Sequence, residues 1–544
     1  MPVVNITFDR MAKFLPKTKA EQALDMLPFI GLDIEGIEDG MVRVEYNPNR
    51  PDFSSDYGII RALRGLLGYE TGMPKFRLAG KTGFSVKVEK PVKEVRPFVV
   101  ALAATNGQLD DETIRQLIAM QEDLHNGIGR RRKKASIGIH NLDAVSFPVT
   151  YTALPDFLFT PFGQSVKMSA RQILAETETG KAYGHILQDK YPIIYDSAGN
   201  VLSFPPIING ADTKVDVGCK NLFVEVTATD KKAAHDTLAV IAYMLYDAGF
   251  KIKTVTIEDG KKTETPALAA TKMDVEAKYI NELLGLDISA TKIVECLKKS
   301  RLDARPNKTR ISCTIPRYRI DITNPVDLVE EVAVGYGIYN LEPTILPSTT
   351  AGQRSKMSDY FEAIRQTLTG LGMTESFNFS LTSRQVQYDL SNRPSDGEIS
   401  VDGSKSAEHE VLRSSLVPSL LQSLSRNVHE EYPQKIFEIG KVFFKQTDRI
   451  DEKWFLAAII THDQAGFTEI KSSMQALFGS AFGLPVSTKA ASNPLFIKGR
   501  CAQIIKDSQV GIIGEVSPAV LQNFKLRMPA AAFEVDLTGL LAVH

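Results

Sequence analysis

Four acidic side chains stand close together in the segment PRYRIDITNPVDLVEEVAVGYG. They are Asp321, Asp327, Glu330 and Glu331. The pair Asn324 and Pro325 predicts the start of a helix, with asparagine as the N-cap and proline in the first position. The last three carboxylates then project onto one side of that helix. Hard carboxylate oxygens without histidine or cysteine suit Mg²⁺, so these four residues are a candidate magnesium site.

The same acidic residues also have a purely structural interpretation. Acidic side chains in the first turn of a helix interact favourably with the helix dipole, and Arg317 and Arg319 are placed to neutralise them. Because acidic first turns are common, the spacing alone favours the structural role.

A second candidate site lies in the segments LSFPPIING and NLFVEVTATD. Pro205 and Pro206 remove two backbone donors and fix an extended path beside Ser203. Glu225 and Thr227 alternate with apolar residues in a predicted strand, so both point to one face of it. Such a pair either lines a pocket or forms the solvated face of an edge strand, and the pattern does not decide between the two.

The basic run Arg130–Lys134 is the one dense positive cluster of the chain. A run of this kind either contacts a phosphate backbone or is a solvated loop, and charge runs are more often solvated loops.

Several other chemistries are not indicated by the sequence. It contains no G-x-S-x-G and no H-E-x-x-H motif. His185 and His235 are weighed as bases of the second domain, but a lone histidine is more often a packed core residue. The cysteines are far apart, which disfavours a thiolate zinc site and a disulfide framework. They are Cys219, Cys296, Cys313 and Cys501.

Length and composition are those of a multidomain globular protein. The chain has 544 residues, of which 43% are hydrophobic, and its net charge of −1 excludes a histone-like polycation without excluding nucleic acid. Asp9 interrupts the apolar core that a signal peptide needs, and the apolar stretch 238–250 is too short to span a bilayer. We expect a soluble, cytoplasmic protein without membrane association.

The elements that must position these residues fall into four expected domains. Residues 1–88 predict a small α/β unit, and residues 89–265 predict strands mixed with two helices around an irregular middle. Residues 266–343 predict two helices, a strand and the acidic segment. Residues 344–544 begin with an amphipathic helix over 357–371 and continue with a sheet of several strands.

Three stretches together resemble one known family. They are YNPNRPDFSSDYGIIRALRGLLG, PRYRIDITNPVDLVEEVAVGYG and LRSSLVPSLLQSLSRNVHEEYPQKIFEIGKVF. With LSFPPIING and NLFVEVTATD, they are similar to the β subunit of phenylalanyl-tRNA synthetase in its shorter archaeal or eukaryotic form. The resemblance covers essentially the whole chain and keeps the order of the domains.

The resemblance implies a multidomain α+β fold with a role for each part. Residues 1–88 would be the N-terminal α/β domain, and residues 89–265 an editing domain that deacylates tRNA. Residues 266–343 would form a small helical or winged magnesium-bearing domain. Residues 344–544 would form an antiparallel sheet domain like a class II aminoacyl-tRNA synthetase core that has lost its catalytic residues.

The implied enzyme is a heterotetramer of two α and two β subunits that joins phenylalanine to tRNA(Phe) with ATP. In that family the acidic motif binds Mg²⁺ at a site shared with the α subunit. The matching positions here are Asp321, Asp327, Glu330 and Glu331. ATP and phenylalanine would bind through α.

The resemblance also implies hydrolytic editing of tyrosyl-tRNA by the second domain. Ser203, Glu225 and Thr227 fall on the stretches that line the editing pocket of archaeal-type relatives. Glu225 stands where aspartate is expected and Ala228 where glycine is usual, so the detailed geometry of this pocket departs from the family pattern.

The last domain lacks the class II signature residues. Arg413 and Glu438 lie in the corresponding region but do not form the short Arg-x-Glu unit that holds ATP and the amino acid. Without an arginine on the transferring phosphate, adenylation loses its main electrostatic help, so we expect activation to occur in α. The alternative is a non-catalytic RNA-binding or magnesium-dependent scaffold protein.

Overall fold

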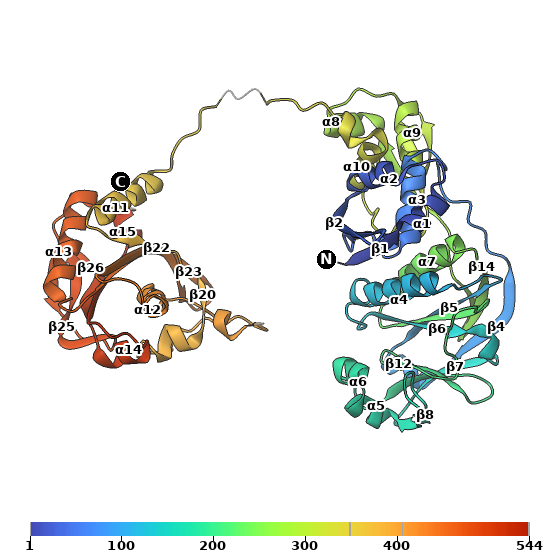
Figure 1. The fold of residues 1–544 in the computed structure, drawn as a ribbon, viewed down its shortest axis with the longest axis horizontal. Helices are drawn as coiled ribbons and strands as arrows, with labels where there is room; N and C mark the ends of the chain where they lie inside the picture. The colour runs from blue at the N-terminus through green and yellow to red at the C-terminus, as the bar shows by residue number, and fades with distance from the viewer. Residues whose placement is uncertain (1, 347–349, 405, 542–544) are drawn as a thin grey trace. The chain divides into compact units, whose positions relative to one another are not determined.

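The structure, a computed structural model, describes residues 2–346, 350–404 and 406–541. The chain folds into two compact units, Met1–Ile345 and Leu346–His544 (Figure 1). Each unit combines sheets with helices, so the expected mixed α+β multidomain class is confirmed. Within the described ranges, no helix has both the length and the apolar character needed to cross a bilayer.

The first unit begins with a three-stranded antiparallel sheet in the order β1-β3-β2. The strands are β1 (Val3–Thr7), β2 (Leu32–Glu38) and β3 (Met41–Tyr46), and the helices are α1 (Phe8–Phe14), α2 (Ala20–Met26) and α3 (Asp56–Leu66). Buried and more exposed residues alternate along β3, so Val42 and Val44 reach one core with Met11 and Leu63 from the helices. This part has its own apolar centre.

A ten-stranded sheet follows, in the order β12-β11-β10-β7-β4-β14-β5-β13-β6 with β15 beside β14. Its strands are β4 (Lys81–Val88), β5 (Phe98–Thr105), β6 (Ala135–Asn141), β7 (Val149–Leu154), β10 (Tyr191–Tyr195), β11 (Val201–Phe204), β12 (Ile208–Asn209), β13 (Leu222–Ala228), β14 (Lys251–Asp259) and β15 (Lys261–Thr265). The expected boundary at residue 88 falls at the end of β4, and β4 pairs with both β7 and β14. The sheet therefore begins before that boundary, at Lys81.

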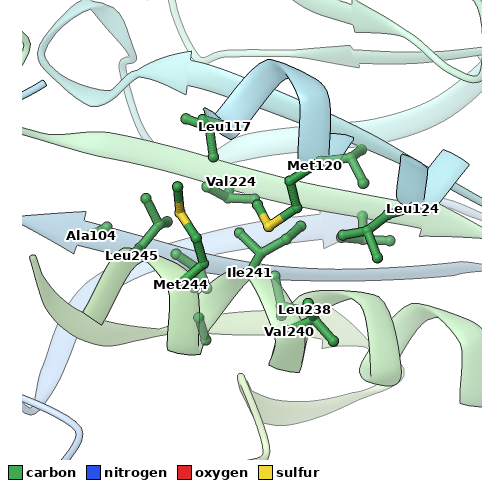
Figure 2. Close-up of a cluster of buried hydrophobic side chains, with 14 of the residues drawn as sticks. Ala104, Leu117, Met120, Leu124, Val224, Leu238, Val240, Ile241, Met244 and Leu245 are labelled. Atoms are coloured by element: carbon green, nitrogen blue, oxygen red, sulfur yellow. The ribbon is translucent and has the colours of Figure 1, made fainter. Parts of the chain in front are cut away.

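Two helices, α4 (Asp111–Asn126) and α7 (Lys231–Asp247), pack against this sheet. Figure 2 shows Met120 of α4 and Ile241 of α7 meeting around Val224 of β13. Nearly every residue of α7 between Ala233 and Leu245 is buried, which explains its weak amphipathic pattern in the sequence.

The ten-stranded sheet curls, so that β11 approaches β6 although the two lie near opposite ends of the strand order. Residues inside the curl, among them Ala101, Tyr151 and Phe223, form a second apolar cluster. Smaller elements lie beside β11 and β12. They are β8 (Leu158–Phe159), β9 (Met168–Ser169), α5 (Ala170–Glu176) and α6 (Glu178–Tyr183).

The third part of the first unit is a three-stranded antiparallel sheet, β16-β18-β17, with three helices. Its elements are β16 (Thr271–Glu276), α8 (Ala277–Leu284), α9 (Ala290–Lys299), β17 (Asp303–Asn307), β18 (Arg310–Ile315) and α10 (Pro325–Tyr336). It is tied to the N-terminal part, because Arg301 donates to the Glu70 carbonyl at 2.6 Å and the Gly72 amide donates to the Lys298 carbonyl at 2.7 Å.

The second unit is built on a seven-stranded sheet in the order β19-β22-β23-β27-β26-β25-β24, antiparallel except for the β19–β22 pair. The strands are β19 (Thr374–Glu375), β22 (Gln434–Lys445), β23 (Ile450–Thr461), β24 (Ser487–Ala490), β25 (Phe496–Lys506), β26 (Ser508–Val516) and β27 (Ala530–Asp536). Helices α11 (Lys356–Gly370) and α13 (Phe467–Leu477) share one apolar cluster with the sheet, and α12 (Val417–Arg426) and α14 (Pro518–Asn523) share another. The class II-like character of this domain stays an expectation.

Arg413 and Glu438 form a buried ion pair on the β22 sheet. Arg413 Nη1 donates to Glu438 Oε1 at 2.5 Å, and its Nε donates to the Lys441 carbonyl at 2.9 Å. Asn378 donates to Glu438 Oε2 at 2.8 Å. A Cβ at Gly440 would collide with the Arg413 guanidinium, so this glycine leaves room for the arginine. Both charged groups are thus held by protein partners.

Replacing Glu438 by alanine is expected to destabilise the second unit by about 3–5 kcal/mol, because it leaves the Arg413 charge buried and unpaired. Urea unfolding measures this loss. The control is Glu452→Gln, which breaks the exposed pair between Lys441 and Glu452 and is expected to lose less than about 1 kcal/mol. Equal losses in the two variants would contradict the structural role of the buried pair.

Candidate functional site

A cavity of about 310 Å³ opens beside α4 and β6 in the first unit. Its walls come from α4, from β6, from residues 203–210, which span the end of β11 and β12, and from residues 213–215. Apolar side chains such as Ile114, Leu117 and Ile207 line much of it, and Ser203 and Glu225 add polar groups. A mostly apolar hollow with a few convergent polar groups is the usual form of a small-molecule site.

Ser203 and Glu225 are brought together in this cavity. The Ser203 hydroxyl donates to Glu225 Oε1 at 2.9 Å, and Glu225 is only 2% exposed. Strand β13, which carries Glu225, is paired on both sides, with β5 and with β6. The edge-strand interpretation is therefore excluded, and the polar pair faces the interior of the curled sheet.

His140 on β6 lies against the same carboxylate. Its Nδ1 is 2.9 Å from the Thr213 hydroxyl, and its Nε2 is 3.9 Å from Glu225 Oε1. Among the described residues, neither His140 Nε2 nor Glu225 Oε2 has a hydrogen-bond partner, although both atoms are buried. Buried polar atoms without partners are uncommon, and at a cavity they indicate that a ligand or water completes the site.

Gly138 provides the space in which Glu225 and His140 approach each other. A Cβ at this position would collide with Glu225 Oε1 and with His140 Nε2. Gly138 pairs directly with Glu225 across β6 and β13, so the carboxylate folds over the glycine. Any larger residue would displace the carboxylate from the cavity wall.

Thr227 lies behind the cavity wall. Its hydroxyl accepts a hydrogen bond from Arg96 Nε at 3.0 Å and lies 3.0 Å from the Ser136 hydroxyl. Ser136 lines the cavity, whereas Thr227 does not. Burial lowers the pKa of Arg96 to about 10, because none of the described carboxylates forms an ion pair with its guanidinium. Of the three predicted pocket residues, two therefore line the cavity and the third supports it.

His125 and Glu122 of α4 complete one wall. The Ile137 amide donates to His125 Nε2 at 2.9 Å, so the ring proton lies on Nδ1, 3.3 Å from Glu122 Oε1. Burial lowers the pKa of His125, which keeps the ring neutral. Hydrogen bonding to His125 and the charge of Arg132 lower the pKa of Glu122 to about 2 against the effect of burial.

Residues 130–134, which we call the arginine turn, connect α4 to β6. Arg130, Arg131 and Arg132 have φ values of 49°, 54° and 64°. Each non-glycine residue in this left-handed region costs roughly 1–2 kcal/mol. Arg132 is buried in the cavity wall, where it donates to the Ile207 carbonyl at 3.0 Å and to Glu122 at 2.8 Å. The solvated-loop interpretation is therefore wrong for Arg132, whereas the other four residues are exposed.

Arg319 holds two of the four predicted metal ligands. It donates to Asp321 through Nε at 2.9 Å and through Nη2 at 2.6 Å, and the same Nη2 donates to Glu331. Arg50 lies 3.9 Å from both carboxylates. Burial opposes the charge on Asp321, but these arginines lower its pKa below the ordinary value. The predicted neutralising role is confirmed for Arg319, while Arg317 instead pairs with Asp236.

The other two carboxylates do different things. Asp327 accepts hydrogen bonds from the Thr323 and Asn324 amides, both at 2.7 Å, and so caps helix α10. Glu330 is exposed. Among the described residues, no group of three or more histidine, cysteine or acidic side chains is arranged to hold a metal. The four carboxylates therefore do not fit a magnesium centre in this chain alone, and magnesium binding stays a prediction.

Comparison with known proteins places the chain in a family. The phenylalanine--tRNA ligase beta subunit of Archaeoglobus fulgidus is 40% identical over 547 residues, which cover 99% of this chain and 98% of the relative. The chain belongs to the family of phenylalanine--tRNA ligase beta subunits. The family member of Methanocaldococcus jannaschii is 35% identical over 554 residues, covering 99% of this chain and 100% of that one. The expected archaeal-type aminoacyl-tRNA synthetase subunit is confirmed at the level of the family.

Two domain models of the family match parts of the chain. The tRNA synthetase B5 domain matches residues 273–338, and the phenylalanyl tRNA synthetase beta chain CLM domain matches residues 343–537. A crystal structure of an N-terminal fragment of the phenylalanyl-tRNA synthetase beta subunit from Pyrococcus horikoshii superposes with a TM-score of 0.60 at 30% identity. That likeness covers 62% of this chain and 99% of the fragment.

Sequence reasoning missed several residues around the cavity. It weighed His185 and His235, whereas His125 lines the cavity and His140 lies beside Glu225. The sequence places His140 two residues after Gly138, but it does not show that their strand neighbours the strand of Glu225. Only the strand register, which the sequence does not reveal, brings the three together.

Gly138→Ala is expected to destabilise the first unit by about 1–3 kcal/mol, because its methyl group overpacks a closed interior. Thermal and urea unfolding measure this loss. Gly36→Ala, at a position with open space, is the control and is expected to change stability by less than about 0.5 kcal/mol. Adding Glu225→Ala to Gly138→Ala removes the collision with the carboxylate and is expected to recover part of the lost stability. If the stability losses of the two single variants simply add in the double variant, the predicted collision is contradicted.

Glu330→Gln is expected to raise the melting temperature by up to about 2 °C at pH 7. Although Glu330 is exposed, partial desolvation of its carboxyl and then the charge of Glu331 raise its pKa, so its charged form weakens the folded state above that pKa. The effect vanishes as the pH falls below the ordinary glutamate pKa of about 4.3, because the carboxyl is then protonated in both states. Glu342→Gln, at an exposed position, is the control. A variant less stable at pH 7 would contradict this prediction.

The same measurement tests the magnesium prediction. If the acidic residues bind Mg²⁺ in this chain, millimolar MgCl₂ raises the melting temperature of the wild type and not that of Glu330→Gln. Because Arg319 and the helix cap already engage the other three carboxylates, we expect no shift in either protein.

Proposed function

We propose that this chain is the β subunit of an α2β2 phenylalanine–tRNA ligase of the cytoplasm. The α subunit would join phenylalanine to tRNA(Phe) with ATP, and the β subunit would remove wrongly attached tyrosine by hydrolysis. The name of the relatives and their full-length similarity support the first part. The polar constellation in the cavity supports the second.

Aminoacylation would take place in α because the second unit offers no free arginine at the expected position. The Arg413 guanidinium is engaged by Glu438, by the Lys441 carbonyl and by the Asn378 carbonyl. An arginine that stabilises a transferring phosphate must present its donors to the ligand. Arg413 instead serves the packing of the sheet.

The single observation that carries the editing proposal is the free oxygen of Glu225. Glu225 Oε2 is buried beside an apolar cavity and has no partner among the described residues. The phenol group of a tyrosyl ester has the matching donor, and the phenyl group of a phenylalanyl ester has none. Ser203 and His140 would fix the carboxylate so that Oε2 points to the substrate.

An editing site of this kind would discriminate tyrosine from phenylalanine better than the aminoacylation site can. A pocket made for phenylalanine rejects an added hydroxyl only weakly, by roughly 100-fold. A site built to hydrogen-bond a hydroxyl rejects the analogue without it by about 10⁴- to 10⁵-fold, because its buried polar groups are then left unpaired. The second site therefore selects tyrosine for removal and spares phenylalanine.

The magnesium proposal rests on the family resemblance and on Glu330. Among the four predicted ligands, Glu330 is the exposed carboxylate without a hydrogen-bond or ion-pair partner in the described chain. A shared site would need the remaining ligands from α. Calorimetric titration of MgCl₂ into the α/β complex and into β alone separates a shared site from a site in β.

Glu225→Gln in the α/β complex is expected to lower kcat/KM for deacylation of tyrosyl-tRNA(Phe) by about 10- to 100-fold, since a hydrogen bond to a charged group is worth about 1.5–3 kcal/mol. Glu225→Asp keeps the charge and is expected to retain most of the activity. Glu258→Gln, on β14 and paired with Lys262, is the control. Aminoacylation with phenylalanine is the second readout and should not change.

Unchanged deacylation in Glu225→Gln would remove this residue from the site. A complex that binds tRNA but deacylates and charges nothing would favour the alternative function, a non-catalytic RNA-binding scaffold. Full phenylalanine charging by the β subunit without α would overturn the proposed division of labour.

A further inference from the structure

The arginine turn presents cations on the surface next to the cavity. Arg130, Arg131, Lys133 and Lys134 are exposed, and Lys134 lies 3.4 Å from Asp230. In the described part of the chain, the side chains of the other three make no hydrogen bond or ion pair. Their positive charges are therefore available to a ligand.

The turn borders two hollows. Arg132 lines the cavity that contains Glu225, while Arg130 and Lys134 line a second hollow of about 560 Å³. Lys232, at the start of α7, lines the second hollow as well. The exposed cations thus stand one residue away from the wall of the proposed editing cavity.

The field at this surface is positive in spite of Asp230 and Asp236. Each of these acids is already engaged, Asp230 with Lys134 and Asp236 with Lys232 at 2.7 Å. His235, between them, has its pKa lowered by burial and then by the charges of Arg317 and Lys231. The lowered pKa of His235 is thus in part an effect of the positive charges around it.

The backbone of the turn is held in place from inside. Thr229 Oγ1 donates to the Lys133 carbonyl at 2.9 Å, and Arg96 Nη1 donates to the same carbonyl at 3.3 Å. Arg132 anchors the turn to the cavity wall through Glu122 and the Ile207 carbonyl. These contacts fix a left-handed path that points the neighbouring side chains outward, so the cations are pre-organised.

We propose that the arginine turn binds the phosphates of the RNA strand that leads to the aminoacyl ester in the cavity. Every nucleotide before the ester carries a phosphate, so a site that receives the ester also receives negative charge within a few nucleotides. Arg130, Arg131 and Lys133 are the phosphate-binding residues, and Arg132 belongs to the cavity. This inference rests on the proposed editing function and adds the place at which the RNA is held.

The test is the triple variant Arg130→Gln, Arg131→Gln and Lys133→Gln in the α/β complex, with deacylation of tyrosyl-tRNA(Phe) as the readout. KM is expected to rise about tenfold or more, and the loss falls in KM rather than in kcat. The slope of log KM against log salt is expected to fall by about 2, since three phosphate contacts on a single strand are removed.

Two matched variants control for charge and for folding. Lys251→Gln, Lys261→Gln and Lys262→Gln remove three exposed lysines from β14 and β15 of the same domain, and the KM is expected to stay within twofold of the wild type. Arg130→Lys with Arg131→Lys keeps the charges and is expected to keep the KM. A melting temperature equal to that of the wild type shows that the triple variant is folded.

An unchanged KM and salt slope in the folded triple variant, together with a loss of deacylation in Glu225→Gln, would overturn this inference and leave the editing proposal standing. If Glu225→Gln has no effect, fluorescence anisotropy of labelled, uncharged tRNA(Phe) still tests the turn. Weaker binding by the triple variant alone would support the RNA contact, and equal binding by both triple variants would overturn it.

Discussion

The burial of one carboxylate governs the interior of the ten-stranded sheet. Glu225 lies where the two ends of the curled sheet approach each other. A buried carboxylate needs hydrogen bonds, because without them the free-energy cost of removing it from water strongly destabilises the fold. Ser203 supplies one bond, Gly138 supplies the space and His140 lies beside it. These contacts leave the second carboxylate oxygen, Glu225 Oε2, without a partner beside the cavity in the described part of the chain.

Arginines determine what the other acidic residues do. Arg319 joins Asp321 to Glu331 in the first unit, and Arg413 holds Glu438 in the second. In each case a carboxylate is paired with a buried guanidinium of its own chain, and removing one partner leaves a buried charge. These ion pairs therefore stabilise the local structure around each arginine.

Local patterns were enough to predict much of the fold. The helix over 357–371 is α11, and the pair Asn324 and Pro325 begins α10, because capping and apolar periodicity act within a few residues. The pocket was predictable only as one of two alternatives. Burial of Glu225 on both sides depends on the pairing of β13 with β5 and β6, and these partners lie far from it in the sequence. The position of His140 beside Glu225 and the burial of Arg132 also depend on partners far away in the sequence, so neither could be predicted from local patterns.

Contacts between the first and third parts of the first unit join residues that are far apart in the sequence and are therefore synthesised at different times. Arg50 lies against Asp321 and Glu331, and Gly72 donates to Lys298. At 5–20 residues per second, Arg50 leaves the ribosome roughly 15–55 s before Glu331. For that time Arg50 has Asp52 as its carboxylate partner, whereas the Gly72 amide lacks its acceptor, the Lys298 carbonyl. The surface of the N-terminal part toward the third part is therefore open to solvent and to chaperones until the acidic helix has been made.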